Sequence, residues 1–151
     1  MVGLDIRVKN EYNSYLKKLF ESIDLSIYDW YIYWDELHFI ENGKTITGFE
    51  SSFLDGNSFV DAISKECYYM VFADFKAYLP GSIRTPTKTY EDFTNSECQI
   101  IFSCVDCTFI MIYCKNIDIL KKIYANCLSM NVDSVKYTSA EDVKGRTISE
   151  G

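Results

Sequence analysis

The sequence predicts one α+β domain: a mostly antiparallel sheet of about six to eight strands, with two longer helices on one face and one or two short helices. Short runs of apolar and β-branched residues, several of them alternating with polar ones, are joined mostly by short turns, which favours antiparallel pairing. Two segments carry apolar residues at the three- and four-residue spacing of amphipathic helices. A chain of 151 residues can bury one core but is short for two domains. We therefore assign residues 1–138 to a single domain and residues 139–151 to a polar C-terminal tail.

The elements follow from local patterns taken in chain order. Asn10 can cap the first helix and Asn116 the last, because a short polar side chain accepts a bond from the free N–H groups of a first turn. Asn42-Gly43 predicts a two-residue turn, and Pro80-Gly81 ends the β-rich run at 67–79. In order, the expected elements are a strand at 4–9, a helix at 11–23, strands at 30–34, 37–40 and 45–47, a short helix after 55–57, a strand at 67–79, one helical turn at 89–93, a hairpin at 99–113, a helix at 117–130 and a strand at 132–137.

Charge and hydropathy exclude several classes of protein. The net charge is −7, so anionic partners are repelled and we expect no binding of nucleic acid. No apolar run is long enough for a membrane-spanning helix, and the first nine residues do not resemble a signal peptide. We therefore expect a cytoplasmic protein that does not bind membranes.

The charge is concentrated in one part of the chain. Residues 19–64 contain nine carboxylates and one lysine, a net charge of −8, whereas the remainder is close to neutral. This asymmetry predicts an acidic surface that attracts a basic partner.

The six cysteines and the one histidine are better explained by structural roles than by chemistry. Cys104 and Cys107 have the spacing of half a zinc site, but no second pair matches them, and a cytoplasmic protein keeps its thiols reduced. His38 follows Leu37 in an expected strand and should face solvent, and no nucleophile motif accompanies it. We expect no catalytic residue, no metal site and no cofactor.

An aromatic strand within the acidic segment is the candidate binding site. If residues 30–34 are extended, Trp30, Ile32 and Trp34 share one face and Tyr31, Tyr33 and Asp35 the other. Tyrosine is common at interface hot spots, and surrounding carboxylates would steer a basic partner. Packing of these rings beneath a helix or loop explains the pattern equally well. The candidate partner-binding residues are Tyr28, Asp29, Tyr31, Tyr33, Asp35 and Glu36.

Several stretches resemble a small family of about this length from Gram-positive, Bacillus-type bacteria, known as a domain of unknown function. The matching stretches cover most of the chain: Asn10 to Tyr12, Tyr28 to Trp30, Cys67 to Ala77, Lys88 to Phe93, Asn95 to Gln99 and Ile112 to Lys115. The resemblance implies a bacterial cytoplasmic protein with no assigned activity, and it supplies no site residues.

The first hypothesis for function is a non-catalytic, acidic protein-binding module of immunity or antitoxin type that occludes a basic partner protein. A second is a small-ligand-binding protein or enzyme with a cleft between sheet and helices. A third is a cytoplasmic homodimer with a structural role, so that the chain is either a monomer or a weak homodimer.

Overall fold

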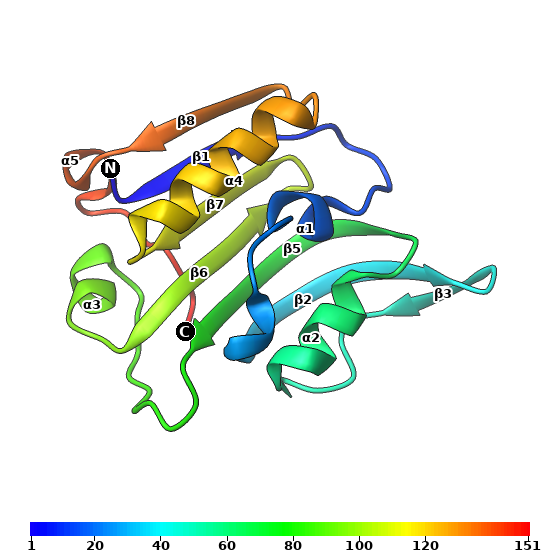
Figure 1. The fold of residues 1–151 in the computed structure, drawn as a ribbon, viewed down its shortest axis with the longest axis horizontal. Coiled ribbons are helices and arrows are strands. Elements are labelled where there is room, and N and C mark those ends of the chain that lie inside the picture. The colour runs from blue at the N-terminus through cyan, green and yellow to red at the C-terminus, as the bar shows by residue number, and fades with distance from the viewer.

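Eight antiparallel strands form one sheet in the computed structural model, which describes residues 1–151 (Figure 1). The spatial order is β3-β2-β5-β6-β7-β1-β8, and the short β4 pairs with β2 beside β3. The predicted fold class is therefore confirmed. The strands are β1 (Gly3–Arg7), β2 (Asp29–Glu41), β3 (Lys44–Thr47), β4 (Phe53–Leu54), β5 (Cys67–Tyr78), β6 (Cys98–Val105), β7 (Phe109–Cys114) and β8 (Ser134–Thr138).

The first face of the sheet is covered by the helices α1 (Tyr15–Leu19), α2 (Gly56–Ile63) and α4 (Ile117–Ser129) and the short 3-10 helix η1 (Leu25–Ile27) (Figure 1). Their apolar sides and the strands enclose a core of 30 buried residues. Trp30 is central to it, because its ring stacks on Phe59 of α2 with centroids 4.0 Å apart and its indole N–H donates to the Leu25 carbonyl at 3.2 Å. Many of the aromatic side chains are therefore buried between the sheet and the helices.

The second face is covered by α3 (Tyr90–Thr94), α5 (Ala140–Val143) and the last residues of the chain, which pass behind the sheet in Figure 1. A smaller cluster of eight buried residues lies there, and it includes Val143 and Ile148. The Ser103 hydroxyl donates to the Ile148 carbonyl at 3.1 Å. The segment expected to be a polar tail therefore packs against the sheet, because its few apolar residues are buried and its polar groups are hydrogen-bonded.

The N-terminal helix is shorter than the expected range of 11–23. Asn13 pairs with Tyr68 of β5, its N–H bonding the Tyr68 carbonyl at 2.9 Å, and this keeps the chain extended up to Ser14. The helix ends at Leu19, and Ser22 has a positive φ of 67° that no helix continues through. The two longest helices are consequently α4, where the sequence predicts one, and α2.

The two strands expected at 30–34 and 37–40 are one continuous strand, β2, with two irregularities in its pairing to β5. The strand continues between the two expected segments because Asp35 and Glu36 pair with Ala73 and Phe72 of β5. None of the helices is both long and apolar enough to cross a lipid bilayer.

Candidate functional site

The candidate residues of β2 do not form one surface. The register with β5 shifts between Ile32, which faces Phe75, and Trp34, which faces Asp74, so that Tyr33 is an extra residue in β2. This bulge places Trp34 on the second face, opposite to the face of Trp30 and Ile32. The expectation that these three residues share a face is therefore wrong.

The six candidate residues consequently divide between the two faces. Tyr28 is buried in the first-face core, its ring packed edge-on to Trp30. Asp35 also lies on the first face, where its carboxylate accepts the N–H of Phe49 at 2.9 Å. The second face carries the other four, Asp29, Tyr31, Tyr33 and Glu36.

Cations, not carboxylates, contact the two central tyrosines. The Arg84 guanidinium lies 3.8 Å from the centroid of the Tyr31 ring, and its Nη1 donates to the Tyr33 hydroxyl at 3.4 Å. The Lys76 ammonium lies 4.4 Å from the centroid of the Tyr33 ring. Glu36 is exposed nearby and accepts the indole N–H of Trp34 at 2.8 Å. The surroundings of Tyr31 and Tyr33 are therefore partly cationic.

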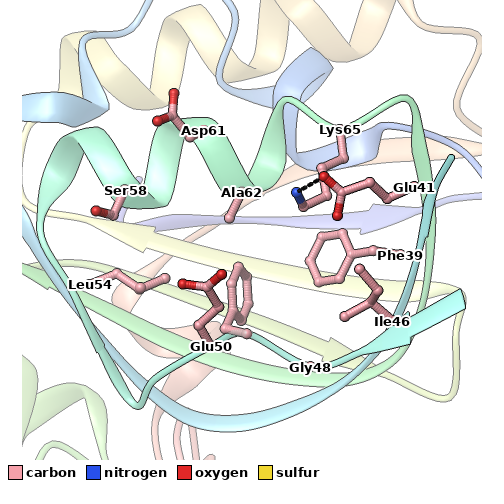
Figure 2. Close-up of a pocket in the computed structure, with 11 residues that line it drawn as sticks. Phe39, Glu41, Ile46, Gly48, Glu50, Leu54, Ser58, Asp61, Ala62 and Lys65 are labelled. Carbon is pink, nitrogen blue, oxygen red and sulfur yellow. Dashed lines mark hydrogen bonds and ion pairs between the residues drawn. The ribbon is translucent and has the colours of Figure 1, made fainter. Parts of the chain in front are cut away.

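The acidic segment instead builds a groove on the first face, between α2 and the β2–β3 hairpin (Figure 2). The cavity has a volume of about 260 Å³ and is open to solvent. We call it the α2 groove and define it by its lining residues, which are Phe39, Glu41, Ile46, Gly48, Phe49, Glu50, Leu54, Ser58, Asp61, Ala62 and Lys65.

Local sequence signals position both walls of the groove. Asp55 caps α2 by accepting the N–H of Ser58 at 2.8 Å, and this bond lowers the pKa of the Asp55 carboxyl. The Asn42-Gly43 turn, with positive φ at both residues, returns the chain as β3, an edge strand. Beyond β3 the bond from Phe49 to Asp35 holds the strand exit against β2, so that Phe49 packs on Phe39.

The floor of the groove is apolar and its rim is acidic. Phe39 and Leu54 are buried, whereas Ile46 is 44% exposed. Three carboxylates line the rim, and only one of them is paired: Glu41 accepts a bond from Lys65 at 3.1 Å. Glu50 and Asp61 are exposed and have neither a salt bridge nor a side-chain hydrogen bond to another residue. Figure 2 shows Glu50 projecting toward α2 between Leu54 and Phe39, whereas the Asp61 side chain projects from the other side of the helix, away from Glu50.

Sequence reasoning included these three carboxylates in the acidic segment but did not single them out. The signal that could have found them was the position of Asp61 and Lys65 one turn apart on the expected helix. Asp61 is in the last turn of α2 and Lys65 follows its C-cap Ser64, and both line the groove.

The cysteines and the histidine lie outside this groove. All six thiols are free, and burial raises the pKa of Cys104 to about 12. Cys107 is half-buried, with its Sγ 3.2 Å from the Tyr69 hydroxyl. His38 is also half-buried, and its Nδ1 lies 3.2 Å from Thr47 Oγ1. No group of three or more His, Cys, Asp and Glu side chains is placed to hold a metal ion.

The fold and the groove define a small α+β protein with a single antiparallel sheet and an open, acid-rimmed cavity on its helical face. The chain belongs to a family described as "Protein of unknown function (DUF2691)", which matches residues 1–149. It is similar to the "Uncharacterized protein YncE" of Bacillus subtilis (strain 168), with 26% identity over 143 residues and 93% of each chain covered. No solved structure matches the chain. The predicted resemblance to a Bacillus-type family of unknown function is confirmed.

Proposed function

We propose that this chain is a non-catalytic, cytoplasmic binding protein of immunity or antitoxin type, and that its α2 groove takes up a basic segment of a partner protein. The observation that carries the proposal is an apolar floor bordered by two unpaired carboxylates, set within a segment of net charge −8. If that basic segment contains the partner's binding site for an anionic substrate, binding in the groove would block that site.

The chemistry of the groove specifies what it would recognise. Ile46 and Leu54 offer apolar contact to aliphatic side chains, while Glu50 and Asp61 offer acceptors to lysine or arginine. The Lys65–Glu41 pair closes one end, and the unpaired carboxylates Glu50 and Asp61 would repel an acidic or phosphorylated segment. An extended segment with alternating basic and aliphatic residues fits this arrangement.

An enzyme using the same groove is the weaker alternative. The cavity volume of about 260 Å³ lies below the roughly 300–1,000 Å³ of small-molecule sites. Ser58 is its sole hydroxyl residue, and the one histidine of the chain does not line it. These features favour a protein segment over a small substrate.

Binding of a short fluorescein-labelled peptide in which lysine and leucine alternate tests the proposal, with fluorescence anisotropy as the measurement. A peptide of alternating glutamate and leucine is the control ligand. We expect the basic peptide to bind and the acidic one not to. The double variant Glu50→Gln, Asp61→Asn should weaken binding about tenfold, since it removes two charges without changing side-chain size.

Glu141→Gln is the matched control variant, because Glu141 is an exposed carboxylate of α5 on the second face. It should bind the basic peptide as the unmodified protein does. Equal affinity of the double variant and the unmodified protein would overturn the proposal. A dimer detected by light scattering that dissociates on Ile46→Asp would instead assign the groove to a second copy of the chain.

A further inference from the structure

A second cavity lies on the opposite face of the sheet, around Tyr33. It has a volume of about 390 Å³ and is lined by Tyr33, Arg84, Thr85, Pro86, Lys88 and Gly151. We call it the Tyr33 site. Its wall is formed where residues 84–89 meet residues 147–151, held by bonds from Thr87 N to the Gly151 carbonyl at 3.0 Å and from Ile148 N to the Lys88 carbonyl at 2.7 Å.

A buried cation without a partner lies against this site. Lys76 is fully buried, and its ammonium makes no hydrogen bond, although it contacts the Tyr33 ring. Burying an unpaired charge is costly, so such a group requires a physical explanation. The hydroxyls of Tyr78 and Thr87 are likewise buried without a partner, and Thr87 lies between two residues that line the site.

The carboxylates close to Lys76 are bound to other donors. Asp74 is the nearer along β5, and it accepts the Ser149 hydroxyl at 2.9 Å and the Glu150 N–H at 2.7 Å. Asp92 accepts the N–H groups of Lys88 and Thr89 at 3.1 and 3.0 Å, where it caps α3. Burial lowers the pKa of the Lys76 ammonium, with Asp74 acting in the opposite direction. The Lys76 ammonium therefore has no carboxylate hydrogen-bonded to it.

Two exposed cations complete the site. Arg84 is held in place by its stacking on Tyr31 and its bond to the Tyr33 hydroxyl, and Lys88 also lines the site. Neither has a carboxylate oxygen within 4 Å, since the salt bridges of the chain involve Lys9, Lys65 and Arg146. Three cations without a salt bridge thus line or border one site in a chain whose net charge is −7.

We propose that the Tyr33 site binds the phosphoryl group of a small molecule, a function separate from that of the α2 groove. Arg84 and Lys88 supply donors from the rim, because a planar guanidinium and a flexible ammonium are the usual ligands of phosphate oxygens. Lys76 supplies positive charge from behind the Tyr33 ring. Three cations favour a dianion over a monoanion such as a carboxylate.

Isothermal titration of the protein with inorganic phosphate, at an ionic strength held constant with sodium chloride, tests the proposal. We expect saturable binding of phosphate that sulfate competes for, and clearly weaker binding of acetate. Arg84→Gln and Lys88→Gln should each weaken phosphate binding about tenfold, since each removes a charged hydrogen-bond donor. Binding of acetate as tight as that of phosphate would overturn the choice of a phosphoryl group.

Lys121→Gln is the matched control, because Lys121 is an exposed lysine on α4, on the other face. It should leave phosphate binding unchanged. Lys76→Met should weaken phosphate binding while the circular dichroism spectrum is retained, and the two exposed variants keep the test valid if Lys76→Met does not fold. Absence of saturable binding, or equal weakening by Lys121→Gln and Arg84→Gln, would overturn the proposal.

Discussion

At the scale of single residues, Gly48 is required where the chain leaves β3. Its φ is +74°, and a Cβ there would lie 2.8 Å from the Asp35 carboxylate that accepts the N–H of Phe49. Gly48→Ala should therefore both strain the backbone and displace Asp35. Gly43→Ala isolates the first effect, because Gly43 has the same φ and no atom within 4 Å of the position of a Cβ.

We expect Gly43→Ala to cost about 1 kcal/mol of unfolding free energy and Gly48→Ala at least about 1 kcal/mol more. Urea denaturation of the two variants measures both values. Equal losses would show that the Asp35 contact contributes nothing to stability.

Asp74 should make stability depend on pH. Burial raises the pKa of its carboxyl, although the bonds from Glu150 and Ser149 act in the opposite direction. A carboxyl whose pKa is higher in the folded state favours folding at low pH, and that contribution is lost as the pH rises from about 4 through the folded-state pKa. Asp74→Asn removes the ionisation and keeps the size of the side chain.

The unfolding free energy of Asp74→Asn, relative to the unmodified protein, should consequently rise between pH 4 and pH 7. Urea denaturation at several pH values in this range measures the change. Glu141→Gln, an exposed carboxylate variant, should give a curve parallel to that of the unmodified protein. A parallel curve for Asp74→Asn as well would contradict the expected direction.

The candidate site shows the limit of residue-level prediction. The alternation of β2 is predictable up to Ile32, because apolar and polar residues alternate there in step with the pleat. The bulge at Tyr33 is not, since it is fixed by the register with β5 and by the Lys76 and Arg84 contacts, which come from distant parts of the chain. One inserted residue moves Trp34 to the other face and divides the expected site.

At the scale of elements, a helix is predictable from local sequence where it has both a capping residue and a row of apolar residues on one side. Asn116 caps α4 by accepting the N–H groups of Asp118 and Ile119, so its start is correctly predicted. The helix expected at 11–23 is interrupted because Asn13 pairs with Tyr68, a long-range contact that outweighs helix propensity. The packing of residues 139–151 is not predictable from their polar composition, because composition does not show that Val143 and Ile148 are buried against the sheet.

The docking of this last segment gives a prediction with an internal control. Ile148 is 1% exposed and Ile83 is 73% exposed. Ile148→Ala should lower the unfolding free energy by about 3 kcal/mol, because it removes buried apolar atoms from the second-face cluster. Ile83→Ala should change it by no more than about 0.5 kcal/mol. Urea denaturation compares the two, and equal small effects would mean that residues 139–151 behave as a tail in solution.

At the scale of the whole molecule, the uneven distribution of charge along the sequence becomes an uneven distribution across the sheet. The acidic segment forms one end of the sheet, β2 to β4 with η1 and α2, while the strands β6, β7, β1 and β8 come from the near-neutral remainder (Figure 1). Composition predicted this separation because the segment is continuous in sequence. It could not predict that Lys76 and Arg84 would contact Tyr33 and Tyr31 on the second face of that same end.

The negative charge at the acidic end of the sheet should increase the rate at which a basic ligand associates. Exposed charges are screened over about 10 Å at 0.1 M salt and about 3 Å at 1 M, so steering by the groove rim is lost across that range. The association rate of the lysine–leucine peptide, measured by stopped-flow fluorescence, should therefore fall steeply with salt for the unmodified protein and less steeply for Glu50→Gln, Asp61→Asn. Glu141→Gln should keep the steep dependence, since its carboxylate lies on the other face. Association rates independent of salt would remove the electrostatic basis of the proposed binding. A dependence that the double variant retains in full would place the steering charge elsewhere on the acidic end, with the α2 groove contributing only its apolar floor.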